Sequence, residues 1–347
     1  MKSPVSFTRR DFLKFSTAGA VGMLLAETSL DRALAAAAPI ASQGRVLMSG
    51  LFLYDTPSFA AKKHKAFGKD WVVPISEVVE GEAGNPFNTA WYHIGDEGYT
   101  YSGWVQPVET VYQKPNFHVR AEGQLGEITV PYSVSRIQPD TRSESADRLY
   151  YQSTHWVRQI VVNRQEKSIW YEIYNFHRRL AYYVPAYDMR LVPDDELAPL
   201  SADVPEDLKY IYVDLATQSV TAFEDEKPVL ISRCSSGAGR TKTPLGDFRT
   251  FHKGSTVHMT NEGDDDANIY DLPGVPWVSF FTGTGIAFHG TYWHNDFGRP
   301  RSHGCVNLPS EDAKFIYRWT RPVVPPEMNY LYRLGEGTAV HVTKSTE

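Results

Sequence analysis

The segment Ser302–Asn307, which reads SHGCVN, constrains this chain more than any other stretch of its sequence. It contains Cys305, one of only two cysteines, and His289 lies 16 residues before that cysteine. A thiol attacks a carbonyl carbon as the thiolate, and an unperturbed cysteine has a pKa of about 8.5. A histidine beside the thiol can stabilise the thiolate as an imidazolium and later protonate the leaving amine. We therefore interpret Cys305 as a nucleophile that the fold brings to His289, rather than as a small buried thiol.

Three other kinds of site do not fit these residues. A zinc site built from the nearby histidines and Cys305 lacks both the i, i+4 spacing of a zinc-binding helix and a second neighbouring cysteine. In papain-like proteases the cysteine precedes its histidine along the chain, whereas His289 comes before Cys305 here. The chain contains no G-x-S-x-G elbow of a serine hydrolase. The residues therefore predict thiol acyl transfer without a metal or an organic cofactor.

The pattern resembles the catalytic domain of L,D-transpeptidases, a family of bacterial cell-wall enzymes. The resemblance rests on the HG pair that begins at His289, on SHGCVN, and on TPLGDF at residues 243–248, and it covers residues 205–343. It implies a mainly β fold, with a sandwich-like catalytic domain that carries one or two short helices. It also implies that Cys305 is the nucleophile, that His289 is the general base, and that the Gly290 carbonyl holds the His289 ring.

The loop around the cysteine offers further candidates for the site. Gly304 permits close backbone approach, and the amide groups of Gly304 and Cys305 can form an oxyanion hole. His303 either polarises the thiol as a second histidine or serves as a structural hydrogen-bonding residue of the loop. By resemblance, Ser302, His303 and Gly304 shape the pocket, and Asn307 supports the loop.

Substrate-binding residues are harder to choose from the sequence. Stem peptides of the cell wall carry carboxylates, which arginines pair well, and Arg301 is our candidate beside Arg240 and Arg299. Aromatic residues near the motif suit either a cleft wall or the core. Cys234 is expected to be a packed free thiol rather than a disulfide partner of Cys305. Our substrate-binding set is Ser302, Asn307, Trp277, Tyr292 and Arg301.

The resemblance also implies a reaction. Such enzymes act on stem tetrapeptides of peptidoglycan at the bond between an L-centre and D-Ala. Cys305 would attack the carbonyl and release D-Ala, and the thioester would pass to a side-chain amine of another stem to form a 3→3 cross-link. We keep two alternatives: an L,D-carboxypeptidase, in which water takes the acyl group, and a non-catalytic cell-wall-binding protein. Stem peptides are the expected partners of a monomeric enzyme.

The first residues predict export in the folded state. Thr8–Lys14, which reads TRRDFLK, is typical of a twin-arginine signal, and Ala33–Ala36 supplies an A-x-A cleavage site. The uncharged stretch between them is shorter than the ~20 residues of a membrane-spanning helix, although an uncleaved signal would serve as an anchor. We therefore exclude residues 1–38 from the fold and expect the protein in the periplasm or the cell-wall zone.

Between the signal and the catalytic domain the sequence predicts two small β modules. Short strands punctuated by Gly and Pro at 40–108 resemble a bacterial Src-homology-3-like barrel. WYEI at 170–173 repeats WYHI at 91–94, so 109–200 reads as a degenerate second copy, in which YYVP at 182–185 takes the place of GWVQP at 103–107. Pro193–Pro205 reads as the linker to the catalytic domain.

These modules are expected to bind wall polymer or to cover the cleft, without performing chemistry. Aromatic residues make up 13% of the chain, which suits β structure and sugar-stacking surfaces. The net charge of −6 provides no basic excess for nucleic acid. A chain that begins at Ser201 is therefore predicted to retain the reactivity of the thiol.

Overall fold

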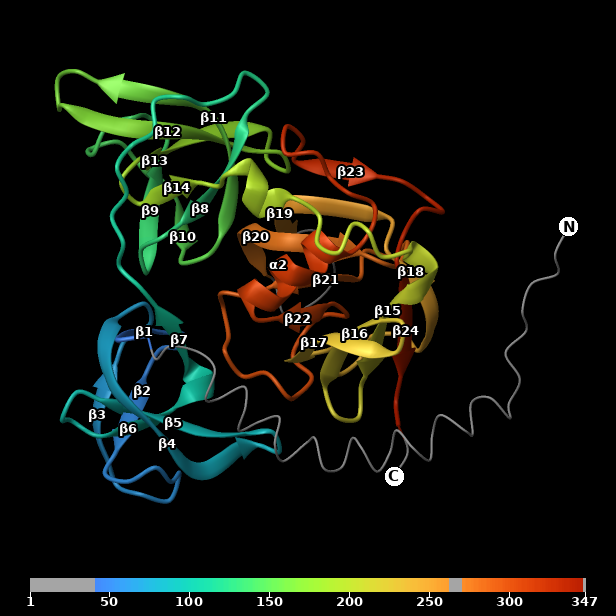
Figure 1. The fold of residues 1–347 in the computed structure, drawn as a ribbon. Coiled ribbons are helices and arrows are strands. Elements are labelled where there is room, and N and C mark those ends of the chain that lie inside the picture. Colours follow the sequence, from blue (N-terminus) through green and yellow to red (C-terminus); the bar gives the residue numbers. More distant parts are fainter. Residues whose placement is uncertain (1–40, 262–269, 346–347) are drawn as a thin grey trace, which may run out of the picture. The chain divides into compact units, whose positions relative to one another are not determined.

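The computed structural model describes residues 41–261 and 270–345. The predicted export signal lies outside these residues. They are mainly β, as predicted, and they form two seven-stranded sheets, two five-stranded sheets and one α-helix (Figure 1). Within these residues, no helix combines the length and the apolar character that crossing a membrane requires.

The first sheet, blue to teal in Figure 1, has the strand order β3-β2-β6-β5-β4-β1-β7. Leu51 and Leu53 are fully buried while Phe52 between them is exposed, which is the period-two pattern of a half-buried strand. We call residues 43–108 the first module. Its strands are β1 (Gln43–Val46), β2 (Leu51–Tyr54), β3 (Lys63–Phe67), β4 (Val72–Asn85), β5 (Asn88–Ile94), β6 (Tyr99–Tyr101) and β7 (Val105–Val108).

The second sheet, green in Figure 1, has the order β10-β9-β13-β12-β11-β8-β14. Counted from its own first strand, this order is the same as that of the first sheet, and β12 with WYEI occupies the place of β5 with WYHI. YYVP lies on β13, whose counterpart is β6, so its predicted match to GWVQP was wrong. We call residues 124–191 the second module. Its strands are β8 (Gln124–Ile128), β9 (Tyr132–Arg136), β10 (Ser145–Tyr150), β11 (Thr154–Asn163), β12 (Ser168–Asn175), β13 (Leu180–Pro185) and β14 (Met189–Leu191).

Two five-stranded sheets, yellow to red in Figure 1, make up the C-terminal domain, residues 209–343. One has the order β17-β16-β15-β24-β18 and the other the order β22-β21-β20-β19-β23. Most neighbours are antiparallel, but β15 pairs with β24 in parallel, and so does β21 with β22. The strands are β15 (Lys209–Asp214), β16 (Ser219–Glu224), β17 (Lys227–Arg233), β18 (Gly246–Arg249), β19 (His252–Thr260), β20 (Asp271–Phe280), β21 (Ala287–Gly290), β22 (Val306–Leu308), β23 (Tyr330–Tyr332) and β24 (Ala339–Thr343).

Helix α2 (Ser310–Trp319) follows directly after β22 and packs on β20 and β21. Ala313, Ile316 and Tyr317 are buried at the i, i+3, i+4 spacing of an amphipathic helix. The helix ends at Trp319, and Ser310, its first residue, follows Pro309 at the N-cap, which makes no side-chain capping bond. At the other end, the buried ammonium group of Lys253 on β19 donates to the carbonyl oxygens of Tyr317 and Thr320, and the second of these distances is 2.8 Å.

The predicted linker packs onto the C-terminal domain. Val192 and Leu197 are buried in the same core as α2 and the inner residues of β15 and β21. The backbone N–H of Leu200 donates to the Arg318 carbonyl oxygen at 3.1 Å. Two short 3₁₀ turns, η2 (Asp194–Leu197) and η3 (Glu206–Leu208), interrupt the segment. Residues 192–200 therefore contribute apolar surface to the C-terminal core instead of forming a free tether.

Candidate active site

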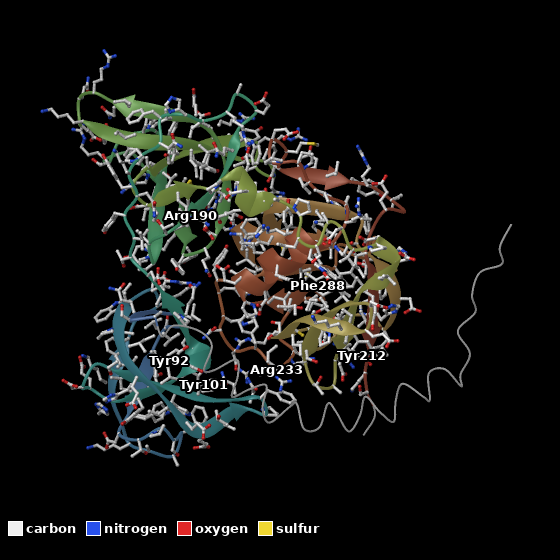
Figure 2. All side chains as sticks on the ribbon, in the orientation of Figure 1. Tyr92, Tyr101, Arg190, Tyr212, Arg233 and Phe288 are labelled. Atoms are coloured by element: carbon white, nitrogen blue, oxygen red, sulfur yellow. The ribbon has the colours of Figure 1, made fainter. Side chains whose placement is uncertain are left out.

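Strands β21 and β22 place Cys305 and His289 on one face of their sheet. The two strands run parallel with His289 opposite Asn307, and Cys305 lies two residues before Asn307. Cys305 directly precedes β22 and packs on the cluster of Ala287, which lies two residues from His289 on β21 and therefore shares its face. Phe288, labelled in Figure 2, lies instead in the core that contains α2.

Burial shifts the pKa values of the two groups in opposite directions. It raises the pKa of the Cys305 thiol to about 11, although a backbone hydrogen bond from Ala287 acts against this shift. The Sγ atom lies 3.8 Å from the Gly285 carbonyl oxygen. Burial lowers the pKa of His289 to about 4. The thiol and the imidazole are therefore both neutral between these pH values, and the expected resting pair of thiolate and imidazolium is not what the structure favours.

The tautomer of His289 is set by its neighbour. Nδ1 lies 2.9 Å from the Gly290 carbonyl oxygen, which can only accept, so Nδ1 carries the proton. This is the contact that the family resemblance implied for Gly290. Nε2 is then the unprotonated nitrogen that can take a proton from a thiol. The arrangement suits a general base that acts while the sulfur attacks.

A set of hydrogen bonds holds the loop that carries the cysteine. Ser302 Oγ donates to the Cys305 carbonyl oxygen and accepts from the Gly304 N–H at 3.1 Å. Thr243 Oγ1 donates to the Gly304 carbonyl oxygen at 2.7 Å and accepts from the Gly237 N–H at 2.9 Å. Gly304 has φ +122°, a conformation that favours glycine. Because Ser302 takes the Gly304 amide, the Cys305 amide is the better of the two predicted oxyanion donors.

This geometry belongs to a domain whose sequence matches a known family. Residues 208–342 match the YkuD family, the L,D-transpeptidase catalytic domain. The C-terminal domain is an L,D-transpeptidase catalytic domain. No curated protein matches the chain.

Solved L,D-transpeptidases align with part of the chain. The catalytic domain of the Enterococcus faecium enzyme is 28% identical over 39% of this chain and 96% of its own, with a TM-score of 0.31. L,D-transpeptidase 3 from Mycobacterium tuberculosis is 19% identical over 48% of this chain and 75% of its own, with a TM-score of 0.32. A mutant structure of the E. faecium L,D-transpeptidase is 25% identical over 39% of this chain, with a TM-score of 0.31. Only 49% of that protein's length is covered.

The first module contacts the segment of the transpeptidase domain that joins His289 and Gly290 to the loop of Cys305. We call Thr291–Arg301 the connecting loop. Its Asp296 is fully buried and accepts from Asn85 Nδ2 at 2.7 Å and from the Tyr101 hydroxyl at 2.8 Å, both of the first module (Figure 2 labels Tyr101). Burial, followed by the Asp296 charge, raises the pKa of Tyr101. Arg301 pairs with the second oxygen of Asp296 at 2.7 Å.

Two more contacts extend this attachment. Asn295 Nδ2 donates to the Ser102 carbonyl oxygen at 3.2 Å. Arg45, almost fully buried on β1, donates to the Tyr292 carbonyl oxygen and pairs with Asp70 at 2.7 Å. Burial lowers the pKa of Arg45, and the Asp70 charge opposes that shift. The connecting loop therefore follows the His289–Gly290 pair, precedes the segment that carries Cys305, and is held by the first module in between. No local pattern in the sequence indicates this attachment.

Several predicted site residues have other roles in the structure. Trp277 and Tyr292 are both 1% exposed, but only Trp277 belongs wholly to the core, because Tyr292 lines a cavity of about 250 Å³ together with Trp293. Trp277 packs on Tyr317 of α2, on the sheet face opposite Cys305. Asn307 is buried and donates to His294 Nε2, which supports its predicted role in holding the loop rather than substrate.

The remaining candidates are placed as follows. His303 is exposed, and its ring lies 5.0 Å from that of Tyr270. Cys234 is a fully buried free thiol, as predicted, and burial raises its pKa. Trp293 packs on His289, with 5.6 Å between the ring centres.

Across residues 41–261 and 270–345, no three His, Cys, Asp or Glu side chains are grouped so as to hold a metal ion. Thr243 was not among the predicted site residues. It lies in the TPLGDF segment of the family resemblance, and this segment could have indicated that Thr243 belongs to the site.

Proposed function

We propose that the chain is an exported peptidoglycan L,D-transpeptidase that uses Cys305 as its nucleophile. The observation that supports this most directly is the shared sheet face of Cys305 and His289, with the His289 tautomer set by Gly290. The substrate is a stem tetrapeptide, and the bond broken joins its L-centre to D-Ala. The export signal, the stem peptide and the 3→3 linkage follow from the sequence resemblance and belong to the proposal.

In the proposed first step, Cys305 Sγ attacks the carbonyl carbon and the thiol proton moves to His289 Nε2. The oxyanion is held by the Cys305 amide, and the C–N bond breaks as Nε2 returns the proton to the amine of the leaving D-Ala. In the second step, a side-chain amine of another stem attacks the thioester. That amine loses a proton to Nε2, the thiol re-forms, and an amide cross-link remains.

Incubation of the full chain with tetrapeptide muropeptides, followed by mass analysis, tests the proposal. The expected products are free D-Ala and a dimer of the two stems, by way of a covalent adduct on Cys305. The matched control is Cys305→Ser, which barely changes the volume but supplies a poorer nucleophile, and it should form no dimer. Release of D-Ala with a hydrolysed stem and no dimer would identify the carboxypeptidase. An unreactive Cys305 would leave the wall-binding alternative.

A further inference from the structure

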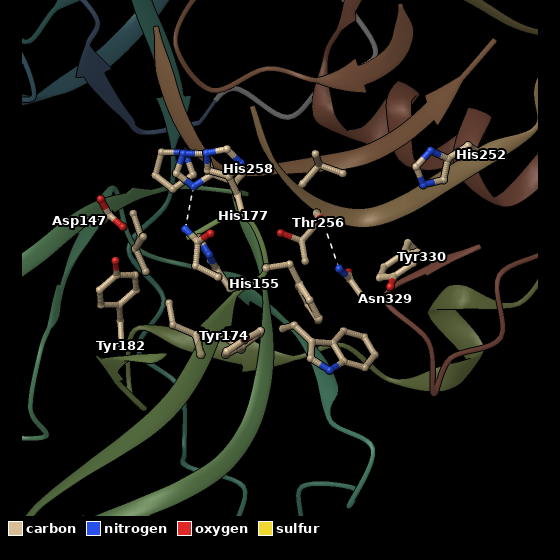
Figure 3. Close-up of a pocket in the computed structure, with 18 of the residues that line it drawn as sticks. Asp147, His155, Tyr174, His177, Tyr182, His252, Thr256, His258, Asn329 and Tyr330 are labelled. Carbon is tan, nitrogen blue, oxygen red and sulfur yellow. Dashed lines mark hydrogen bonds between the residues drawn. The ribbon is translucent and has the colours of Figure 1, made fainter. Parts of the chain in front are cut away.

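A pocket that Cys305 does not line lies where the second module meets β19 and β20 (Figure 3). Its cavity volume is about 400 Å³, within the range of small-ligand sites. Residues from β11, β12 and β13 line one side, and residues from β19, β20 and β23 line the other. We call it the inter-module pocket. Nothing in the proposed chemistry uses it.

Aromatic rings form much of the pocket wall. Phe176 and Tyr330 are 41% and 54% exposed, and their rings meet edge to face at 6.1 Å. His252 stacks on Phe280 at 4.8 Å. Tyr174 completes this aromatic lining (Figure 3). Partly exposed ring faces of this kind offer flat apolar contact area together with polar edges.

Two histidines of the pocket, His252 and His258, are neutral. Burial lowers the pKa of both His252 and His258, although the Asp271 carboxylate that His258 Nε2 contacts opposes the shift of His258. A neutral imidazole has one donor and one acceptor, and those of His258 are taken within the protein. Asn175 Nδ2 lies 2.7 Å from His258 Nδ1. Among the residues that the structure describes, the His252 ring nitrogens and the hydroxyls of Tyr174 and Tyr330 have no hydrogen-bond partner and can serve a ligand.

Charge excludes one class of ligand. Among the described residues no lysine or arginine lines the pocket directly. The nearest guanidinium groups are already engaged, that of Arg158 over the Tyr174 ring at 3.4 Å and that of Arg178 with the lining carboxylate of Asp147. A stem peptide carries carboxylates, which would lose water here without gaining a cationic partner. An uncharged ligand with hydroxyl and amide groups around apolar ring faces fits better. A pyranose ring has these properties.

The pocket also shares a sheet face with the nucleophile. Phe280 is opposite Ala287 in the β20–β21 ladder, and both pack in the cluster that Cys305 contacts. Since β20, β21 and β22 are neighbours, this edge of the pocket lies roughly 10 Å from Cys305, or two strand spacings. A polymer that reached the pocket would place an attached peptide near the thiol.

We propose that the inter-module pocket binds uncharged N-acetylated sugar rings of the wall glycan while the attached stem reacts at Cys305. The identity of the glycan rests on the proposed function, but the recognition of a neutral sugar rests on the pocket. The pocket is then a substrate subsite shared by the second module and the transpeptidase domain. Sugar binding requires no turnover, so it can be measured separately.

The test uses the full chain and chitotetraose, a neutral tetramer of N-acetylglucosamine, with binding followed by calorimetry or NMR. Tyr330→Ala and Phe176→Ala remove exposed rings and should each weaken binding roughly five- to tenfold. Tyr112→Ala is the matched control, because Tyr112 is 71% exposed and lies outside the pocket. Alkylation of Cys305 by iodoacetamide should be the same in all three variants, which shows that the catalytic loop is intact.

The outcomes separate the two proposals. Chitotetraose binding that is lost with Tyr330 or Phe176 supports the subsite, even if the enzyme forms no cross-link. No binding by the unaltered chain, or binding that all three variants retain, overturns it. Binding of a free tetrapeptide instead of the sugar, with the same dependence on Tyr330, would make the pocket a peptide subsite and also contradict the proposal.

Discussion

At the scale of single residues, burial sets the charge of the proposed catalytic pair, Cys305 and His289. A thiol with a pKa near 11 and an imidazole with a pKa near 4 favour the neutral pair at rest. In the proposed reaction the proton therefore moves as the C–S bond forms and charge develops on the oxyanion. His289 is the proposed general base, and its bond to Gly290 matters because it leaves Nε2 free to accept.

The pH dependence of acylation follows from this. His289 must be neutral to accept the proton, and it becomes protonated as pH falls through about 4, not 6.5. The rate of acylation by a carbapenem, followed by mass, should therefore stay level from roughly pH 8 to 5 and fall below that, by up to tenfold per unit. Alkylation by iodoacetamide, which needs the thiolate, should instead rise as pH approaches about 11. A half-maximal acylation rate near pH 6.5 would contradict the neutral pair.

Thr243 provides a second prediction at this scale. Its hydroxyl joins the Gly304 carbonyl to the Gly237 amide inside the protein, so Thr243→Val leaves both groups unpaired. Each unsatisfied buried group costs about 1–3 kcal/mol, so we expect a lower melting temperature and slower acylation. Thr243→Ser keeps the hydroxyl and should retain most of the rate. A slow Thr243→Ser together with an unimpaired Thr243→Val would show that the methyl group, and not the hydroxyl, is what the loop needs.

At the scale of elements, the connecting loop depends on a strand pair from another part of the chain. Asn85, at the end of β4, donates to the Asp296 carboxylate and to the Phe297 carbonyl oxygen. Asp296 is also paired with both Arg299 and Arg301. A buried carboxylate needs such partners to remain charged. The first module thus supplies neutral donors to a charge cluster that lies between the base and the nucleophile.

Asn85→Ala should therefore slow acylation although Asn85 is remote from the reaction in sequence. Losing a hydrogen bond to a charged group costs about 1.5–3 kcal/mol, part of which appears as disorder of the connecting loop. Hydrogen exchange of residues 291–301 should rise, and the acylation rate should fall. Asn88→Ala is the matched control, because Asn88 bonds only within the first module, to Ser102 and Ala90. Indistinguishable exchange in the two variants would refute the attachment.

The two modules share one strand order, which is the order expected if one module is a copy of the other. Each WY-x-I strand lies between the same two neighbours in its own sheet, with β4 and β6 beside β5 and with β11 and β13 beside β12. We propose that 109–200 is a second copy of 40–108, supported by this shared order. The Src-homology-3-like character of the modules and their boundaries stay predictions.

At the scale of the whole molecule, a structural feature could be predicted when the residues that form it are close together in the sequence. Local patterns could be predicted from the sequence, and these include the Cys305 motif, the HG pair at His289 and the repeated WY-x-I strands. The bond from Asn85 to Asp296 joins residues 211 positions apart, and no local periodicity encodes it. The prediction for Trp277 failed for the same reason. An aromatic residue near the motif can lie in the core or in a cleft, and the choice depends on which face of the sheet α2 covers.

These long-range contacts also change what removing the modules should do. The sequence predicted that a chain starting at Ser201 keeps its reactive thiol, because residues 40–200 contain no catalytic pattern. That chain lacks Val192 and Leu197 from the transpeptidase core, and it lacks every donor that the first module gives to the connecting loop. Burying a side chain of this size contributes about 1.5–3 kcal/mol, so the shortened domain should melt well below the full chain.

A chain that starts at Val192 isolates the effect of the modules, because it restores the buried linker residues but not the contacts to the connecting loop. We expect this chain to fold, as judged by circular dichroism, and to be acylated at least about tenfold more slowly than the full chain, the loss expected from about 1.4 kcal/mol of missing loop contacts. Asn85→Ala in the full chain should reproduce part of that loss. Faster acylation of the shortened chain would instead show that the modules cover the cleft. If the shortened chain bound insoluble sacculi as well as the full chain does, the modules would have no role in wall attachment.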